Sequence, residues 1–259
     1  MNPFRLRKQL RLDRRQAHAL VALTLTLTAC ASGESPAATP SASAEVANET
    51  VAGAFREPAV RPIPHQPLPA GTYTSEVFAT PLTYTVPDGW KMFEDEPGQF
   101  GLALVANDGP CLCVWRDVSV AATSCVEEPE PGVGTAAADV VGWLADHEGL
   151  DTSQPEPATL GGLDGYVIDV AMDAAWAETC PFSGGQPIVM TLVGGSISAG
   201  VHWGTDAGSS QRYYVLDLGE GGADGTIAVT IEVCCGAEWE GRIAAATPII
   251  ESFVFDAGG

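Results

Sequence analysis

The sequence predicts an α+β fold, in which one antiparallel β-sheet carries two main helices packed on it. Two observations predict this class. Strand-like segments follow one another through turns rich in glycine, proline and asparagine. The hydrophobic period changes to that of a helix in only two places, within residues 137–148 and after Trp239. Runs of strands interrupted by two helices favour an antiparallel sheet over alternating parallel crossovers.

The strands are predicted from short runs of apolar and β-branched residues bounded by turn residues. The first two form a hairpin around Ala79-Thr80-Pro81, and Pro87-Asp88-Gly89 then turns the chain into Trp90. The predicted strands lie at residues 73–78, 82–86, 100–106, 112–121, 165–172, 188–193, 196–202, 212–218, 226–233 and 253–255.

Each of the two helices is predicted from an apolar stripe at helical spacing. Gly149 supplies a stop for the first helix, and Pro248 is expected to kink or interrupt the second near its third turn. The stripes consist of Ala137, Val140, Val141 and Leu144 in the first helix, and of Trp239, Ile243, Ala246 and Ile250 in the second. The side chains expected to be substantially buried are Trp90, Leu144, Ile243 and Phe253.

The chain divides into three predicted parts. Residues 1–29 have a positive start and an apolar stretch of about a dozen residues, short of the ~20 that span a bilayer, so they form a signal peptide. Residues 30–70 form a tether, because their Ala, Ser, Pro, Thr and Glu cannot bury enough surface to become ordered. Residues 71–256 form a single folded domain with one core.

The end of the signal peptide predicts where the protein works. Leu27-Thr28-Ala29-Cys30 resembles the bacterial lipoprotein signal motif at all four positions. In that family the cysteine receives a diacylglycerol, and fatty-acyl chains such as palmitate anchor a protein at about 0.8 kcal/mol per buried methylene. Cys30 is therefore the predicted lipidation site, on the extracytoplasmic face of the cell membrane. Arg14-Arg15 raises twin-arginine export, but no apolar residue follows soon after, so general secretion is favoured.

The charge of the chain excludes two classes of partner. The full sequence has a formal charge of −21, and removal of residues 1–29 takes away six of 12 Lys+Arg and one of 33 Asp+Glu, which leaves −26. Lys91 is the only lysine that remains. Nucleic acid and anionic lipid surfaces are therefore repelled by the mature chain, and no nucleic-acid partner is expected.

The cysteines predict disulfides, because six remain in an exported chain once Cys30 is assigned to lipid. Cys125 and Cys180 both lie in loop-like, proline-containing segments and are predicted to pair, closing a loop of about 55 residues. No C-x-x-C knuckle is present, so neither zinc nor another metal site is expected. The connectivity of the remaining cysteines stays open: Cys111, Cys113, Cys234 and Cys235.

Two short patterns contain residue types that are found in reactive sites. Neither has the spacing and local structure that the corresponding reaction or metal site requires. Ser198, with His202 and Asp206, approaches a nucleophile elbow, but Ser196 replaces its first glycine and the context runs from strand to strand. The acidic turn 217–224 matches neither an EF-hand loop nor a calcium-binding repeat. The sequence therefore predicts no catalytic residue.

The best candidate for a binding site is the loop 173–186, which is too rich in glycine, proline and polar residues to form an element. It carries Trp176 and Phe182, and the predicted disulfide at Cys180 would pin it. A pinned loop presents its aromatic side chains in a fixed geometry, which lowers the entropy cost of binding.

The order of elements, with the Pro87-Asp88-Gly89-Trp90 turn and the Ser252-Phe253-Val254-Phe255 end, resembles the PsbP-like α/β/α sandwich domains. Actinobacterial lipoproteins of that fold are similar in layout. Actinobacterial envelope proteins are also similar in residues 84–90 and in Thr179-Cys180-Pro181-Phe182. The resemblance implies binding or accessory work and implies no catalytic residue or cofactor.

These observations together predict a non-enzymatic, membrane-anchored envelope lipoprotein. The domain is expected to bind an envelope protein partner or a small apolar ligand, without a cofactor. Two alternatives stay open: a hydrolase that acts on envelope material, for which Ser198 is the candidate nucleophile, and a cation-binding accessory protein, for which residues 217–224 are the candidate site.

Overall fold

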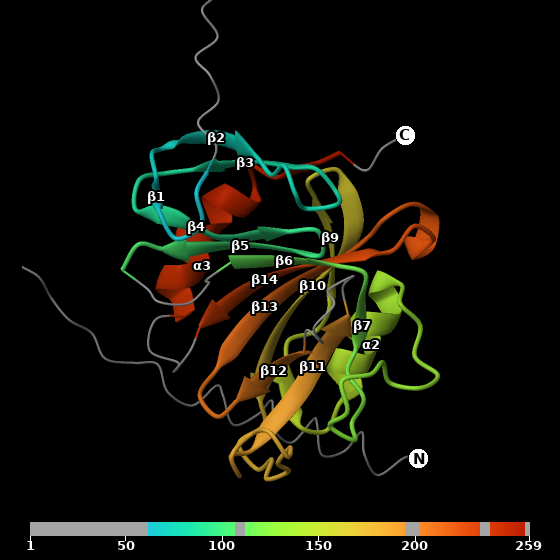
Figure 1. The fold of residues 1–259 in the computed structure, drawn as a ribbon. Helices are drawn as coiled ribbons and strands as arrows, with labels where there is room; N and C mark the ends of the chain where they lie inside the picture. The colour runs from blue at the N-terminus through green and yellow to red at the C-terminus, as the bar shows by residue number, and fades with distance from the viewer. Residues whose placement is uncertain (1–61, 107–111, 195–201, 234–238, 257–259) are drawn as a thin grey trace, which may run out of the picture. The chain divides into compact units, whose positions relative to one another are not determined.

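The computed structural model describes residues 62–106, 112–194, 202–233 and 239–256. These residues belong to one of the two units into which the chain divides, Phe55–Gly259. Their fold is mostly antiparallel β-structure, with fifteen strands in three sheets and two α-helices among the described residues (Figure 1). The prediction of an α+β domain with two helices on one antiparallel sheet, as in a PsbP-like sandwich, is therefore wrong.

The largest sheet has nine strands in the order β1-β4-β5-β6-β14-β13-β10-β8, and β9 also pairs with β10. All of its pairings are antiparallel. The strands are β1 (Pro67–Leu68), β4 (Trp90–Glu96), β5 (Gln99–Leu104), β6 (Leu112–Arg116), β8 (Leu150–Thr152), β9 (Glu156–Leu160), β10 (Leu163–Met172), β13 (Ser210–Asp217) and β14 (Thr226–Val233).

Two three-stranded sheets accompany the large one. The first has the order β15-β3-β2, in which β2 and β3 form the predicted antiparallel pair. The second has the order β12-β11-β7. Their strands are β2 (Gly71–Thr74), β3 (Leu82–Val86), β15 (Val254–Phe255), β7 (Val118–Val120), β11 (Ile188–Gly194) and β12 (His202–Asp206).

The break that separates two of the sheets lies at Asp117. The single strand predicted at 112–121 is divided there into β6 and β7, which belong to different sheets. Asp117 has a left-handed backbone with φ of 55°, and its N–H donates to the carbonyl of Thr226 at 2.7 Å. The carbonyl of Asp117 also lies so close to Gly194 that a Cβ there would come within 2.6 Å of it. The chain therefore leaves the large sheet at this residue.

The helices are α2 (Ala137–Asp146) and α3 (Trp239–Ile250), and a 3₁₀ turn, η1, spans Glu220–Gly222. Ala136 offers no side chain to cap α2, and the carboxylate of Asp217 accepts the Ala137 N–H at 2.8 Å instead. Helix α3 continues through Pro248 to Ile250, so the predicted interruption does not occur. Pro248 and Ala244, whose carbonyl loses a backbone partner, are both exposed and can be hydrated.

The large sheet has a hydrophobic core on each face. One core contains Ile249 of α3 together with Phe253 and the strands β2 and β3, and the other contains Leu144 of α2 together with β7 and β11. Strand β14 shows the alternation that this requires, because Val229 faces the first core and Ala228 the second. Of the side chains predicted to be buried, Trp90, Leu144 and Phe253 are at most 3% exposed, whereas Ile243 is only partly buried.

Candidate ligand-binding site

A disulfide joins the two loops that flank β11 and β7. Because these strands are antiparallel neighbours, the loop that follows β7 and the loop that precedes β11 meet at the same end of their sheet. Cys125 of the first loop is bonded to Cys180 of the second, with 5.5 Å between the Cα atoms. The structure therefore contains the disulfide that the sequence predicts. Cys180 is buried among Ala121, Met190 and Val193.

Trp176 is folded back from its loop onto the domain and is half-buried. Its indole N–H donates to the carbonyl of Ile188 at 3.0 Å. The ring lies over the backbone of Gly149, where a Cβ would come within 2.7 Å of the indole. The N–H of Asp173 donates to the carbonyl of Gly149 at 2.8 Å, which holds the start of this loop against the residues that follow α2. Trp176 is thus held in one position by a hydrogen bond and by packing.

Between Trp176 and the disulfide lies a hollow of about 260 Å³, which we call the Trp176 cleft. Its apolar part includes Val189 and Met190, which are 2% and 6% exposed, and its rim carries hydroxyl groups and the carboxylate of Glu178. The residues that line the cleft are Ala122, Thr123, Ser124, Cys125, His147, Trp176, Glu178, Thr179, Cys180, Ile188, Val189 and Met190.

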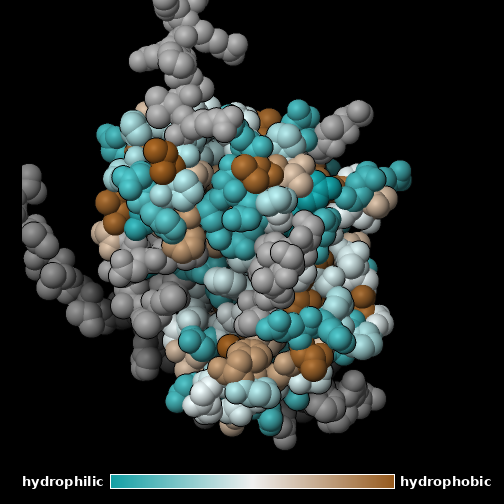
Figure 2. All heavy atoms as spheres, in the orientation of Figure 1, coloured by the Kyte–Doolittle hydropathy of each residue, from teal (hydrophilic) through white to brown (hydrophobic). Residues whose placement is uncertain are grey.

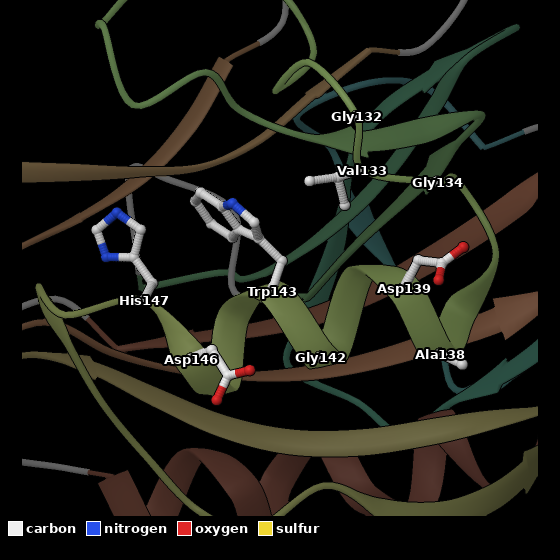
Figure 3. A pocket seen from close by; sticks show the side chains of 9 residues that line it. All are labelled: Gly132, Val133, Gly134, Ala138, Asp139, Gly142, Trp143, Asp146 and His147. Atoms are coloured by element: carbon white, nitrogen blue, oxygen red, sulfur yellow. The ribbon is translucent and has the colours of Figure 1, made fainter. Parts of the chain in front are cut away.

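A second hollow, of about 440 Å³, lies on the outer side of helix α2, and we call it the α2 hollow. Figure 3 shows Trp143 and His147 at one end of it, Asp139 beside Gly134 at the other, and Asp146 on the opposite edge of the helix from Trp143. The lining residues are Gly132, Val133, Gly134, Ala138, Asp139, Gly142, Trp143, Asp146 and His147.

His147 connects the two hollows, since it lines both. Its ring centroid lies 4.7 Å from that of Trp143 and 5.5 Å from that of Trp176. The N–H of Gly149 donates to Nδ1 of His147 at 3.0 Å, so the neutral ring carries its hydrogen on Nε2. Burial lowers the pKa of His147, although the nearby carboxylates of Glu148 and Glu130 oppose this shift.

The other predicted aromatic residue, Phe182, occupies a different place. It lies on the same loop, is 45% exposed and does not line the Trp176 cleft. Ser183 Oγ lies 2.9 Å from the carbonyl of Cys180 and 2.7 Å from that of Gln186, which fixes the turn beyond Phe182. The structure thus brings Trp176 and the disulfide together in one site and places Phe182 outside it.

Several residues singled out from the sequence lie outside the described residues, namely Cys30, Cys111, Ser198, Cys234 and Cys235. Cys113 is a buried thiol. In the part of the chain that the structure describes, no group of three or more His, Cys, Asp or Glu side chains is placed to hold a metal ion. No helix in that part is both long enough and apolar enough to span a membrane.

The sequence reasoning missed Trp143 and His147 as parts of one site. Neither residue was singled out from the sequence. Their spacing of four residues on a helix places the two rings on neighbouring turns of one face. This spacing was the available signal, whereas the approach of Trp176 from a loop 29 positions beyond His147 depends on the tertiary fold.

The face of the molecule seen in Figure 2 has its hydrophobic residues scattered in small groups among hydrophilic ones. Scattered apolar side chains of this kind are usual on a soluble domain. This face therefore shows no broad apolar docking surface. Small hollows are the features that could accommodate a ligand.

No family model and no curated protein matches this chain. Matching solved structures include a protein from Bacteroides thetaiotaomicron, with 11% identity over 73% of this chain and 49% of that chain and a TM-score of 0.33. The match thus spans about half of the Bacteroides chain. The matching structures also include LpqN, involved in cell envelope biogenesis of Mycobacterium tuberculosis. LpqN has 14% identity over 73% of this chain and 89% of that chain, with a TM-score of 0.34. Neither likeness carries an argument about fold or function, and membership of the PsbP-like family is not shown.

Proposed function

We propose that this protein is a non-enzymatic lipoprotein of the cell envelope whose Trp176 cleft binds an apolar group, either a side chain of a protein partner or a small apolar ligand. The observation that carries the proposal is the cleft itself. Trp176, Val189, Met190 and the disulfide give it an apolar lining, and hydroxyl groups surround it. Ligand sites in proteins combine apolar walls with a few polar groups in the same way.

The cleft is formed before any ligand arrives. The Cys125–Cys180 bond and the hydrogen bond from Trp176 to Ile188 hold both of its walls, so little further ordering is needed on binding. A volume of about 260 Å³ lies just below the ~300–1,000 Å³ of typical small-molecule sites. This size suits one large side chain or a small ligand and excludes a long acyl chain.

The envelope location is supported by the start of the chain. A positive segment, a short apolar stretch and Leu27-Thr28-Ala29-Cys30 together form a lipoprotein-type signal. The composition of residues 31–61, which precede the described part of the chain, suits a flexible tether with an r.m.s. reach of roughly 30 Å, which would hold the domain clear of the bilayer. A lipid anchor together with this tether would place the Trp176 cleft within reach of other envelope proteins.

Replacement of Cys30 by alanine is expected to remove the acyl mass and to release the protein from the membrane fraction. The reason is that, apart from the signal peptide, no stretch of the sequence is long and apolar enough to hold a membrane. Fractionation and mass spectrometry of the exported Cys30→Ala variant check this. An exported variant that still sediments with membranes would show that another segment is the anchor.

Binding of a neutral apolar probe, N-phenyl-1-naphthylamine, tests the cleft. We expect saturable binding to the mature chain, residues 30–259 with Cys30→Ala, measured by probe fluorescence. Trp176→Ala should weaken this binding roughly tenfold, because a central aromatic residue is worth about 1–2 kcal/mol in such sites. Thr179→Trp, which fills the cleft and leaves Trp176 in place, should weaken it as well.

Val77→Ala is the control for the probe experiment, since Val77 is an apolar residue, 49% exposed, that does not line the cleft. It should bind the probe as the parent chain does. Unchanged binding in both Trp176→Ala and Thr179→Trp would show that the Trp176 cleft is not the apolar site.

A further inference from the structure

We propose that the α2 hollow binds the guanidinium group of an arginine that belongs to a basic segment of a protein partner. This inference rests on the proposed function in one respect, since it takes the domain to be a binding module. It adds a second subsite, of opposite chemistry, next to the Trp176 cleft. The two subsites share His147 as a wall, so one partner segment can occupy both.

The charge on α2 opposes the usual preference of a helix. The carboxyl end of a helix carries a partial negative charge and favours lysine or arginine, yet the last turn of α2 has no basic residue and ends with Asp146. Glu148 lies two residues beyond Asp146. A charged residue that lowers the stability of its helix, with no neighbouring group to offset the loss, is typical of a functional site. A cation bound here would be stabilised by both carboxylates and by the helix end.

Two acidic residues of α2, Asp139 and Asp146, line the same hollow as Trp143. Asp139 and Asp146 are seven residues apart, which is roughly 10 Å along the helix, and Trp143 lies between them. Gly142 leaves open space in the hollow, since a Cβ there would meet no atom within 4 Å, whereas the carboxylate of Asp139 fills the space beside Gly134. A planar cation that occupies the hollow therefore has both an indole ring and carboxylates among its walls.

Nothing basic among the described residues competes for this position. The described lysine and arginine residues are Lys91, Arg116, Arg212 and Arg242, and none of them lines the α2 hollow. Burial lowers the pKa of His147, at the end of the hollow, and Nδ1 of its ring accepts a hydrogen bond from the Gly149 N–H. The hollow is thus an acidic, aromatic surface in a chain whose mature part carries a formal charge of −26.

Charge complementarity decides the kind of occupant. A strongly acidic chain attracts basic partners and repels anionic lipid and nucleic acid. Guanidinium is favoured over ammonium because it is flat, weakly hydrated and able to stack on an indole while it donates hydrogen bonds to a carboxylate. The hollow is shallow and lies along a helix, so we assign it to a side chain carried by a protein rather than to a free small cation.

The experiment uses the mature chain with Cys30→Ala and three blocked peptides of identical length, Gly-Arg-Gly-Arg-Gly and its lysine and citrulline counterparts. Calorimetric titration in low salt should show binding of the arginine peptide, weaker binding of the lysine peptide and much weaker binding of the neutral citrulline peptide. Binding of the arginine peptide should weaken as salt is raised to 0.15 M, because exposed charges are screened there.

Two variants test the residues of the hollow. Trp143→Leu keeps an apolar side chain at this position and removes the indole face. It should weaken binding of the arginine peptide roughly threefold to tenfold. Asp139→Asn combined with Asp146→Asn should weaken binding and flatten its salt dependence. The matched control is Glu156→Gln, which removes an exposed carboxylate from β9. It should change neither the affinity for the arginine peptide nor the salt dependence of binding.

Equal binding of the citrulline and arginine peptides would overturn the inference, since the peptide backbone would then explain the binding. Equal weakening by Glu156→Gln and by the combined Asp139→Asn and Asp146→Asn variant would also overturn it, since net charge would then explain the binding. Equal binding of lysine and arginine would overturn the assignment to guanidinium. The inference and the proposed function would be contradicted by different results. Trp176→Ala should weaken binding of the probe and leave binding of the arginine peptide unchanged, whereas Trp143→Leu should weaken binding of the arginine peptide and leave binding of the probe unchanged.

Discussion

Replacing Cys125 and Cys180 together by alanine is expected to lower the free energy of unfolding by about 4 kcal/mol. The bond joins residues 55 apart in sequence, and in the chain-entropy model a loop of this length restricts the unfolded chain by that amount. Alanine is preferred to serine because Cys180 is 3% exposed and a buried hydroxyl would add a cost of its own. Urea unfolding of the oxidised wild type and of the double variant gives the difference.

Reduction provides the control for this experiment. Reduced wild type and the double variant should unfold at the same urea concentration if Cys125–Cys180 is the bond that stabilises the domain. A further loss of stability on reducing the double variant would reveal a second disulfide. Equal stability of the oxidised wild type and the double variant would contradict the prediction. The loss of the bond should also weaken binding of the apolar probe, because Cys125 and Cys180 form one wall of the Trp176 cleft.

Glu232→Gln is expected to make the domain more stable than wild type at pH 9 and to leave it unchanged near pH 4.5. Glu232 is 7% exposed, and Thr230 Oγ1 donates to its Oε1 at 3.2 Å. Burial raises the pKa of Glu232 from 4.5 to about 8, although hydrogen bonds from Thr230 and Cys113 act in the opposite direction. Glutamine keeps an acceptor for Thr230 and carries no charge to bury.

The direction of the pH effect follows from the two pKa values. The folded chain retains the proton of Glu232 up to about pH 8, whereas the unfolded chain releases it near pH 4.5. Stability from this group is therefore fully present below pH 4.5 and is lost as the pH rises through 8. Since one pKa unit corresponds to about 1.4 kcal/mol, the loss amounts to a few kcal/mol.

Thermal unfolding of wild type and Glu232→Gln between pH 4 and 9 measures this effect. The difference in stability between the two chains should grow with pH across that interval. Glu156→Gln, on the exposed surface of β9, should show a constant difference from wild type. A constant difference for Glu232→Gln as well would mean that Glu232 is already ionised in the folded chain.

The sequence was informative about elements whose residues alternate or repeat locally. Strand β14 lies at the predicted residues Thr226–Val233, and the apolar stripe headed by Ala137 marks helix α2. Strand β4 (Trp90–Glu96) was missed, because its second half is Glu and Asp and it lacks the apolar alternation of a half-buried strand. These residues are held as a strand by pairing with β5, which is a non-local cause.

The number of sheets could not be predicted for a similar reason. Residues 112–121 have one uninterrupted strand pattern, and nothing in that pattern marks Asp117 as the point where β6 ends and β7 begins. The left-handed backbone there is stabilised by the contacts with Thr226 and Gly194, far away in sequence. One sheet was therefore expected where the structure has several.

The site was predictable to the extent that it depends on loops and cysteines. The loop composition around Cys125 and Cys180 led to the pairing that the structure shows, and the polar loop 173–186 led to Trp176. The contribution of α2 was not predictable in this way. Trp143 lies in α2 and His147 is the first residue beyond it, and the apolar stripe of the helix consists of other residues, so neither was singled out.

The most direct test of the binding site is ¹⁹F NMR of the mature chain labelled with 5-fluorotryptophan, with its six signals assigned by Trp→Phe variants. Addition of the neutral apolar probe should shift the signal of Trp176. The signal of Trp90, which is 3% exposed and belongs to the core on the other face of the large sheet, should stay in place. A shift of Trp90 or Trp239 with no change at Trp176 would contradict the account, because the probe would then bind away from the Trp176 cleft.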